Sequence, residues 1–99
     1  MARHDVYTHR GGDGYLLDVQ ADLLDVLVTR IVVPLLPIAT APKPATRLNP
    51  VFHVDGIEVV MMTQFVSAVR LSVLGEKRGS LAREHDSIVA ALDMAFHGF

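Results

Sequence analysis

Hydrophobic and polar positions alternate in short runs along the first three quarters of the chain, and this pattern predicts short β-strands. Residues 3–9 precede the run GGDG at 11–14, and YLLDVQ at 15–20 follows it. Glycine supplies positive φ at little steric cost, so we expect a hairpin with a flexible tip. The run TRIVVPLLPI at 29–38 is β-branched but holds two prolines. Because proline cannot donate to a ladder, we expect a strand that ends at an edge or a bulge.

The middle of the chain carries a second hairpin signal. Residues 39–50 contain three prolines and predict an extended loop. Asp55 and Gly56 then stand between two apolar runs, and this dipeptide is the strongest short-range signal for a hairpin. A further strand is expected in VRLSVL at 69–74, where apolar and polar residues alternate.

After residues 75–79, the spacing of the apolar positions changes from every second residue to about every three and a half residues, which is typical of a helix. Ser80 is the expected N-cap of a terminal helix. One face of that helix would hold five apolar residues: Leu81, Ile88, Leu92, Ala95 and Phe96. Strands followed by one helix predict an α+β fold, in which a small antiparallel barrel or sheet is covered by the helix, in one domain over residues 1–99. The run ADLLDVL at 21–27 fits either a helical turn or an exposed hydrophobic loop.

Composition adds an expectation about assembly. Hydrophobic residues make up 51% of the 99 positions, which is a high share for a chain whose surface is large relative to its volume. A symmetric homodimer would bury the excess, with residues 59–66 and the strand that follows them as the expected contributors.

Charge and cysteine content exclude several classes of function. The formal net charge is −2, and the lysines and arginines are scattered, so direct nucleic-acid binding is disfavoured. With no cysteine, a disulfide framework and a thiolate nucleophile are excluded. The N-terminus lacks the apolar core of a signal peptide, and the longest apolar run is too short and proline-rich to span a bilayer. We therefore expect a cytoplasmic protein without a membrane segment.

Motifs for catalysis or cofactor binding are weak. The five histidines are not spaced three or four apart on the predicted helix, which disfavours a metal site. Serines occur without a paired base, and no lysine follows the glycine-rich run to form a phosphate cradle. The acidic pairs Asp22 with Asp25 and Glu84 with Asp86 are better explained as solvated charges. The pattern alone favours a binding protein over an enzyme, with no cofactor.

Several segments together resemble a known family. These segments are VYTHR, LLDVQADLLD, TRIVVPL, RLNPVFHVDG, VVMMTQ, the VLG at 73–75, and a terminal helix that closes on Gly98 and one last hydrophobic residue. In this order they resemble the CcdB family of toxin–antitoxin modules over nearly the whole chain.

The resemblance implies a fold and a function. The expected fold is an SH3-like antiparallel β-barrel with a small additional sheet and a C-terminal helix, as in CcdB, Kid and MazF toxins, assembled as a homodimer. The implied function is to bind the A subunit of DNA gyrase and trap its cleaved complex with DNA, with no covalent chemistry by the toxin. A cognate CcdA-like antitoxin with a disordered C-terminal region would neutralise it. Its expected groove lies near the N-terminal hairpin and residues 39–50.

The resemblance also implies which positions contact gyrase. They are the end of the helix and a double-aliphatic loop: Leu23, Leu24, Asp93, Phe96, His97, Gly98 and Phe99. Gyrase poisons of the family carry tryptophan at the position of His97 and isoleucine at that of Phe99. A neutral histidine is a poorer surface than tryptophan for stacking an arginine of the target, and a protonated one would repel it.

Alternatives remain for both the residues and the function. Phe96 is in register with Ile88 and Leu92, so it could equally belong to the core. One of Leu23 and Leu24 could also point inward. The alternative functions are a MazF- or Kid-like endoribonuclease on the same fold, and a degenerate relative that binds antitoxin without poisoning gyrase.

Overall fold

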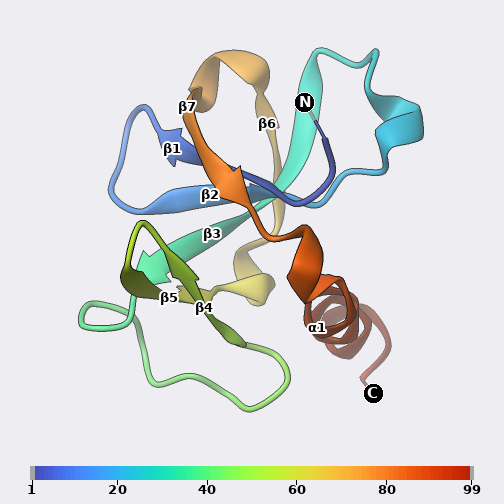
Figure 1. The fold of residues 1–99 in the computed structure, drawn as a ribbon. Helices are drawn as coiled ribbons and strands as arrows, with labels where there is room; N and C mark the ends of the chain where they lie inside the picture. Colours follow the sequence, from blue (N-terminus) through green and yellow to red (C-terminus); the bar gives the residue numbers. More distant parts are fainter. Residues whose placement is uncertain (1, 99) are drawn as a thin grey trace.

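The computed structural model describes residues 2–98, which form a curled antiparallel sheet and a terminal α-helix (Figure 1). The strands are β1 (Asp5–His9), β2 (Tyr15–Asp18), β3 (Thr29–Pro37), β4 (Val51–Val54), β5 (Ile57–Met61), β6 (Ser67–Arg70) and β7 (Leu74–Ser80). The helix α1 spans His85–His97, and short 3-10 turns are η1 (Asp22–Leu24), η2 (Thr63–Phe65), η3 (Leu71–Val73) and η4 (Ala82–Glu84).

The long strand β3 organises the sheet. Its whole length is available for pairing: β2 lies on one side, while β6 pairs with its first half and β5 with its last residues on the other. Within residues 2–98 the sheet has seven strands, in the order β4-β5-β3-β2-β1-β7 with β6 branching from β3. This curled sheet with a terminal helix confirms the predicted α+β, SH3-like class.

Both predicted hairpins form, and glycine explains their turns. Asp55 and Gly56 have φ of 54° and 75°, and positive φ at both central residues is what a two-residue hairpin of this type requires. In the hairpin between β1 and β2, Gly14 has φ of 78°. A Cβ at that position would lie 2.5 Å from the backbone oxygen of Leu35, so a side chain is excluded there.

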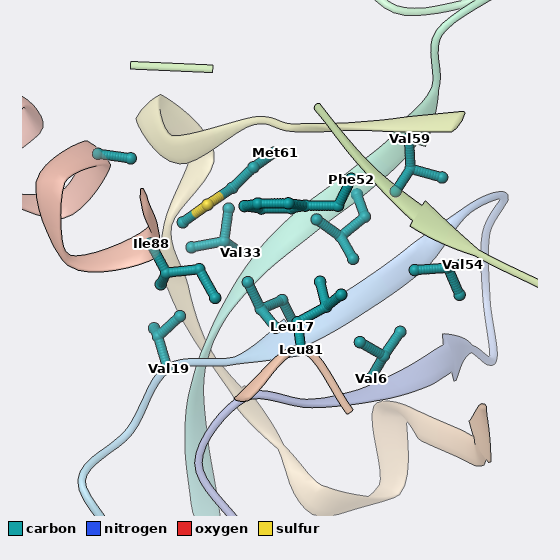
Figure 2. Packing of buried hydrophobic residues seen from close by; sticks show 12 residues of the cluster. Val6, Leu17, Val19, Val33, Phe52, Val54, Val59, Met61, Leu81 and Ile88 are labelled. Atoms are coloured by element: carbon teal, nitrogen blue, oxygen red, sulfur yellow. The ribbon is translucent and has the colours of Figure 1, made fainter. Parts of the chain in front are cut away.

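The main core lies between the curled sheet and the helix. Side chains alternate along each strand, so Leu17 and Val33 face this core while Leu16 and Val32 face a second apolar cluster. Figure 2 shows Ile88 of α1 pointing into the same space as Val33. Ile88 and Ala91 are both fully buried, so they attach the helix to the core.

The expected dimer surface is partly wrong. Val59, Val60, Met61 and Met62 are at most 1% exposed within a single chain. Val59, Val60 and Met61 belong to β5, which is an inner strand because it pairs with both β3 and β4, and Met62 follows it directly. They are therefore not available to an interface, whereas Phe65 at the end of the same stretch is 54% exposed.

The secondary structure before the helix also differs from the one that the sequence predicted. The expected strand over residues 69–74 is interrupted by η3, and β7 continues through the residues expected to be a connection. Ser80 is not the N-cap of α1, as was predicted, because it ends β7 and Glu84 holds the cap position; the Ser80 Oγ accepts a hydrogen bond from the backbone N–H of Ala82 at 3.1 Å. Leu81, expected on the helix, precedes it and packs in the core.

A buried ion pair joins β2 to β3. Arg30 and Asp18 have fully buried side chains, and Nε and Nη2 of Arg30 both donate to Oδ2 of Asp18. Asp18 also accepts a hydrogen bond from the backbone N–H of Gln20 at 3.0 Å. Nη1 of Arg30 reaches Asp25 at 2.9 Å, although the Asp25 side chain is 53% exposed. Burial raises the pKa of Asp18, and the hydrogen bonds from Arg30 and Gln20 act against this change.

Two histidines connect the start of the chain to the start of α1. His4 is 3% exposed, has φ of 74°, and its ring lies 5.1 Å from that of His85 between centroids. Its Nε2 is buried without a hydrogen-bond partner in the structure. Burial, followed by the charges of Arg3 and His85, lowers the pKa of His4, and Asp22 acts in the opposite direction.

We predict that Asp18→Ala lowers the free energy of unfolding by about 3–5 kcal/mol, because it leaves the buried Arg30 charge without its main partner. Urea denaturation followed by circular dichroism measures the change. Asp13→Ala, at the exposed tip of the first hairpin, is the control and should change stability by less than about 0.5 kcal/mol. Equal effects of the two substitutions would contradict a structural role for the pair.

We also predict that stability rises with pH up to about 6.5, the ordinary pKa of histidine. The pKa of His4 in the folded chain lies below this value. Between the folded and the unfolded pKa, the unfolded chain therefore binds more protons than the folded chain, and a fall in pH favours unfolding. Each unit of the difference corresponds to about 1.4 kcal/mol. His4→Asn, which tolerates positive φ, should flatten the dependence in urea titrations at pH 5 and 7.5. An unchanged slope in this variant would exclude His4 as the cause.

Candidate functional site

Gly98 terminates α1, as the sequence predicted. Gly98 adopts the left-handed conformation with φ of 80°, and its N–H donates to the backbone oxygen of Met94 at 3.0 Å. Glycine takes this conformation without a Cβ penalty, and it is the usual residue at this position after a helix. The helix therefore has a defined end, which fixes the direction of the residues on its last turn.

Phe96 lies on this last turn and points away from the core. Its side chain is 66% exposed, although it was expected to be in register with Ile88 and Leu92. The core reaches only as far along the helix as Ile88 and Ala91, with Leu92 packed against its edge. Of the two interpretations left open for Phe96, the exposed one holds within this chain.

A pocket of about 480 Å³ opens beside Phe96. It lies between the last turns of α1 and the 3-10 turn η2. Its lining is mainly apolar and comes from Leu48, Thr63, Gln64, Val66, Met94, Ala95 and Phe96. A concave apolar surface with a few polar groups is typical of a binding site.

Buried polar side chains fix the wall of this pocket opposite the helix. Asn49 donates from Nδ2 to the backbone oxygen of Met61 at 3.0 Å and to Oε1 of Gln64 at 2.8 Å. The hydroxyl of Thr63 donates to the backbone oxygen of Leu48. These bonds attach the loop before β4 to η2, so the pocket wall is held in place by satisfied hydrogen bonds.

The other expected residues of the helix end are also at the surface. Asp93 and His97 are exposed, as is Gly98. Asp93 lies one turn before His97 on α1. Phe99, named among the expected contacts, lies outside the described residues. The structure thus brings together Asp93, Phe96, His97 and Gly98 at one end of the helix.

Leu23 and Leu24 do not join this group within one chain. They belong to η1, which is cyan in Figure 1 and is well separated from the end of α1. A hydrogen bond of 2.7 Å from the backbone N–H of Arg3 to Oδ1 of Asp22 places η1 beside the N-terminal residues instead. Leu23 is 91% and Leu24 43% exposed, so neither belongs to the core.

A group of polar side chains gathers on another part of the surface. Asp55 Oδ2 accepts hydrogen bonds from the Tyr15 hydroxyl at 3.0 Å and from Arg78 Nε at 2.9 Å, and Arg78 Nη1 donates to Glu76 at 3.0 Å. The bonds from Arg78 and then Tyr15 lower the pKa of Asp55. Burial and then the bond to Asp55 raise the pKa of Tyr15. Asp55 is therefore a carboxylate at neutral pH, held beside a cation and a hydroxyl.

Sequence reasoning missed the polar residues beneath η1. Arg30 is completely buried and ion-paired with Asp18. Asp25, expected to be a solvated charge, is its partner. Gln20 is only 2% exposed. The alternation of side chains along a strand could have indicated this burial, because Arg30 lies two residues before Val32 and so shares a strand face with it.

Two further types of site were checked in the part of the chain that the structure describes. Among residues 2–98, no group of three or more histidine, aspartate or glutamate side chains is placed to hold a metal ion. Over the same residues, no helix combines the length and the apolar character needed to cross a bilayer.

Solved structures share this fold. One is an endoribonuclease in complex with its cognate antitoxin from a mycobacterial species, 16% identical, with a TM-score of 0.78 over 96% of this chain and 93% of that one. Another is an endoribonuclease from a mycobacterial species, 17% identical, with a TM-score of 0.77 over 96% of this chain and 89% of that one. At this level of identity the likeness establishes the fold.

These structures correct one expectation from the sequence. The absence of a recognisable catalytic motif, together with the family resemblance, predicted a protein that is not an enzyme. That prediction is contradicted, because both proteins of the same fold are named endoribonucleases. Catalytic residues that come together only in the folded protein leave no spacing motif in the sequence.

A family model also matches the sequence. The model of the CcdB protein matches residues 3–98, which is nearly the full length of the chain. The match includes the strands of the sheet, the turn η1 and the helix end capped by Gly98. The chain therefore belongs to the CcdB family.

Proposed function

We propose that this chain, a toxin of the CcdB family, binds the A subunit of DNA gyrase through the end of α1 and traps the cleaved complex of gyrase with DNA. The observation that carries the proposal is the position of Phe96. Its ring is 66% exposed on a helix end that Gly98 terminates, and it borders an apolar pocket. The choice of gyrase as the target follows what the family resemblance implies.

An exposed phenyl ring beside a pocket suits a protein partner. Aromatic side chains at the centre of an interface supply large contact areas and often dominate its binding energy. Phe96 contributes little to the core of its own chain, so its contact area is available to another molecule. His97 next to it can hydrogen-bond the target but offers a weaker surface for an arginine than tryptophan would.

We expect Phe96→Ala to weaken binding to a gyrase A fragment by about thirtyfold, which corresponds to about 2 kcal/mol. Because the ring is exposed, the melting temperature should change by only a few degrees. His97→Trp should strengthen the same binding if an arginine of the target stacks there. Isothermal titration calorimetry measures the affinities and differential scanning calorimetry the stability.

The matched control for this experiment is Ile57→Ala, which removes an apolar side chain that is 46% exposed on the β4–β5 hairpin. It should leave gyrase binding unchanged. If Phe96→Ala binds as tightly as the control, the helix end is not the contact surface. A fall of many degrees in the melting temperature would place Phe96 in a structural role.

The proposal includes a homodimer. The part of the expected interface that is not buried in the protomer is Phe65 with β6, which pairs with β3 and is mostly exposed. Pairing or packing of this strand with a second copy would cover exposed backbone and apolar surface. Sedimentation at micromolar concentration should give twice the chain mass, and a stable monomer would contradict this part of the proposal.

The proposal also includes an antitoxin. Support comes from the similar endoribonuclease, which was solved with its cognate antitoxin. We place the binding groove near the β1–β2 hairpin and residues 39–50, where a disordered segment could order on contact. A full-length CcdA-like antitoxin should prevent binding of the gyrase A fragment in a competition assay. A ternary complex of all three proteins would contradict the overlap of the two sites.

A second candidate function is cleavage of RNA, which the names of the two similar structures favour. The group formed by Tyr15, Asp55, Glu76 and Arg78 offers a carboxylate to accept a proton from a 2′-hydroxyl, and a guanidinium to stabilise charge on the phosphate. Cleavage of a labelled RNA by the purified chain tests this function. Arg78→Ala should abolish it, whereas Lys77→Ala, a neighbouring cation, should not.

The combined results separate the candidates. Gyrase binding without RNA cleavage supports the first function, and cleavage that depends on Arg78 supports the second. A chain that binds antitoxin but shows neither activity would be the degenerate relative.

A further inference from the structure

His4 occupies an enclosed position where the start of the chain passes the turn before α1 (Figure 1). It is 3% exposed, and its φ of 74° lies in the left-handed region, which residues other than glycine rarely adopt. Its backbone N–H donates to the backbone oxygen of Asp18 at 2.6 Å, and its backbone oxygen accepts from the N–H of Leu81 at 2.8 Å. His4 therefore joins the end of β2 to the residue that precedes η4.

The segment 2–4 also contacts η1 and α1. The backbone N–H of Arg3 donates to Oδ1 of Asp22, the first residue of η1, at 2.7 Å. The ring of His4 lies beside that of His85, the first residue of α1, with 5.1 Å between the two centroids. Segment 2–4 thus connects three elements that are far apart in the sequence: the end of β2, η1 and the start of α1.

The enclosure of the His4 ring suits its neutral form. Within residues 2–98, its Nε2 is buried and has no hydrogen-bond partner. A protonated imidazole carries a hydrogen on both ring nitrogens, so Nε2 of the charged ring would be a buried donor without an acceptor. Such a group is unfavourable because it loses its hydrogen bond to water and gains none in exchange.

The charges around His4 also oppose its protonation. Burial lowers the pKa of His4 most, followed by the positive charges of Arg3 and of a protonated His85. The partial positive charge at the N-terminal end of α1, where His85 lies, acts in the same direction. Asp22 acts in the opposite direction, and the carboxylate of Asp18 is already in an ion pair. The closed structure therefore keeps the ring neutral at pH 7.

We infer that segment 2–4 is an acid-released strap: when His4 is protonated, the segment detaches and frees η1 and the start of α1, while the sheet stays folded. The ring reaches water only when the backbone bonds to Asp18 and Leu81 open, because these bonds fix the position of His4. Opening them also relieves the left-handed φ of this residue. The bond from Arg3 to η1 belongs to the same segment and is released with it.

The direction of the pH response follows from the exposure of the ring. In the open form His4 has a pKa near the ordinary value of about 6.5, which lies above that of the closed form. Between the two values the open form binds more protons, so its population rises as the pH falls. The helix stays attached beyond its first turn because Ile88 and Ala91 are fully buried in the core. Release of the strap therefore precedes global unfolding, which needs more free energy.

Nuclear Overhauser spectra of the full chain at pH 7.5 and pH 5 test the release directly. At pH 7.5 the ring protons of His4 and His85 should give a cross-peak. This cross-peak should be lost at pH 5, and the Leu81 amide signal should leave its folded position. The cross-peaks of Ile88 with core side chains should persist at both pH values. Cross-peaks that all persist, or that all vanish together, overturn the inference.

Substitutions assign the response to His4. His4→Asn tolerates positive φ and does not titrate, so its Leu81 amide signal should keep its position at pH 5. The matched control is His53→Asn, which makes the same change at an exposed position of β4 and should respond like the wild type. A response that survives in His4→Asn, or that is lost in His53→Asn, contradicts the inference.

His85→Asn gives a test that does not depend on whether His4→Asn folds. The charge of His85 opposes protonation of His4, so its removal should move the midpoint of the Leu81 amide titration to higher pH. The same spectra measure this midpoint in the wild type and in the variant. A midpoint that stays in place or moves to lower pH would show that the ring pair does not control the strap.

Discussion

The burial of one charge pair, Arg30 with Asp18, constrains the rest of this structure. A guanidinium without a partner in a core is strongly unfavourable, so β2 and β3 must meet in the one register that brings these side chains together. A shift of one strand by one residue would turn its charged side chain to the other face of the sheet and leave Arg30 and Asp18 on opposite faces. The same register places Leu17 and Val33 in the main core and supports the segment that leaves β2.

Local signals predicted local structure well. Asp55 and Gly56 specify their turn by themselves, since the positive φ of both residues depends only on the dipeptide. The end of the helix at Gly98 follows from the same argument. For the candidate site, the family resemblance implied Asp93, Phe96, His97 and Gly98, and they lie together because all four belong to one helix end, which is itself a local feature.

Properties that depend on distant pairing could not be predicted in this way. Met61 was assigned to an interface because a hydrophobic strand looks the same whether its own chain or a partner covers it. Only the pairing of β5 with both β3 and β4 decides between the two. The separation of Leu23 from the helix end has the same origin, as does the group around Asp55, whose members come from three different parts of the sheet.

The pairing of β1 with β7 has a consequence for biosynthesis. Asp5 lies opposite Ser80 in this ladder, so a strand at the start of the chain finds its neighbour about 75 residues later. On the ribosome, β1 and β2 can form a hairpin early, but one edge of that hairpin stays open until β7 has been made. Pairing over such a separation is slow compared with local contacts, and domains generally fold as units. A translating ribosome therefore carries an unfinished sheet until β7 has emerged from it.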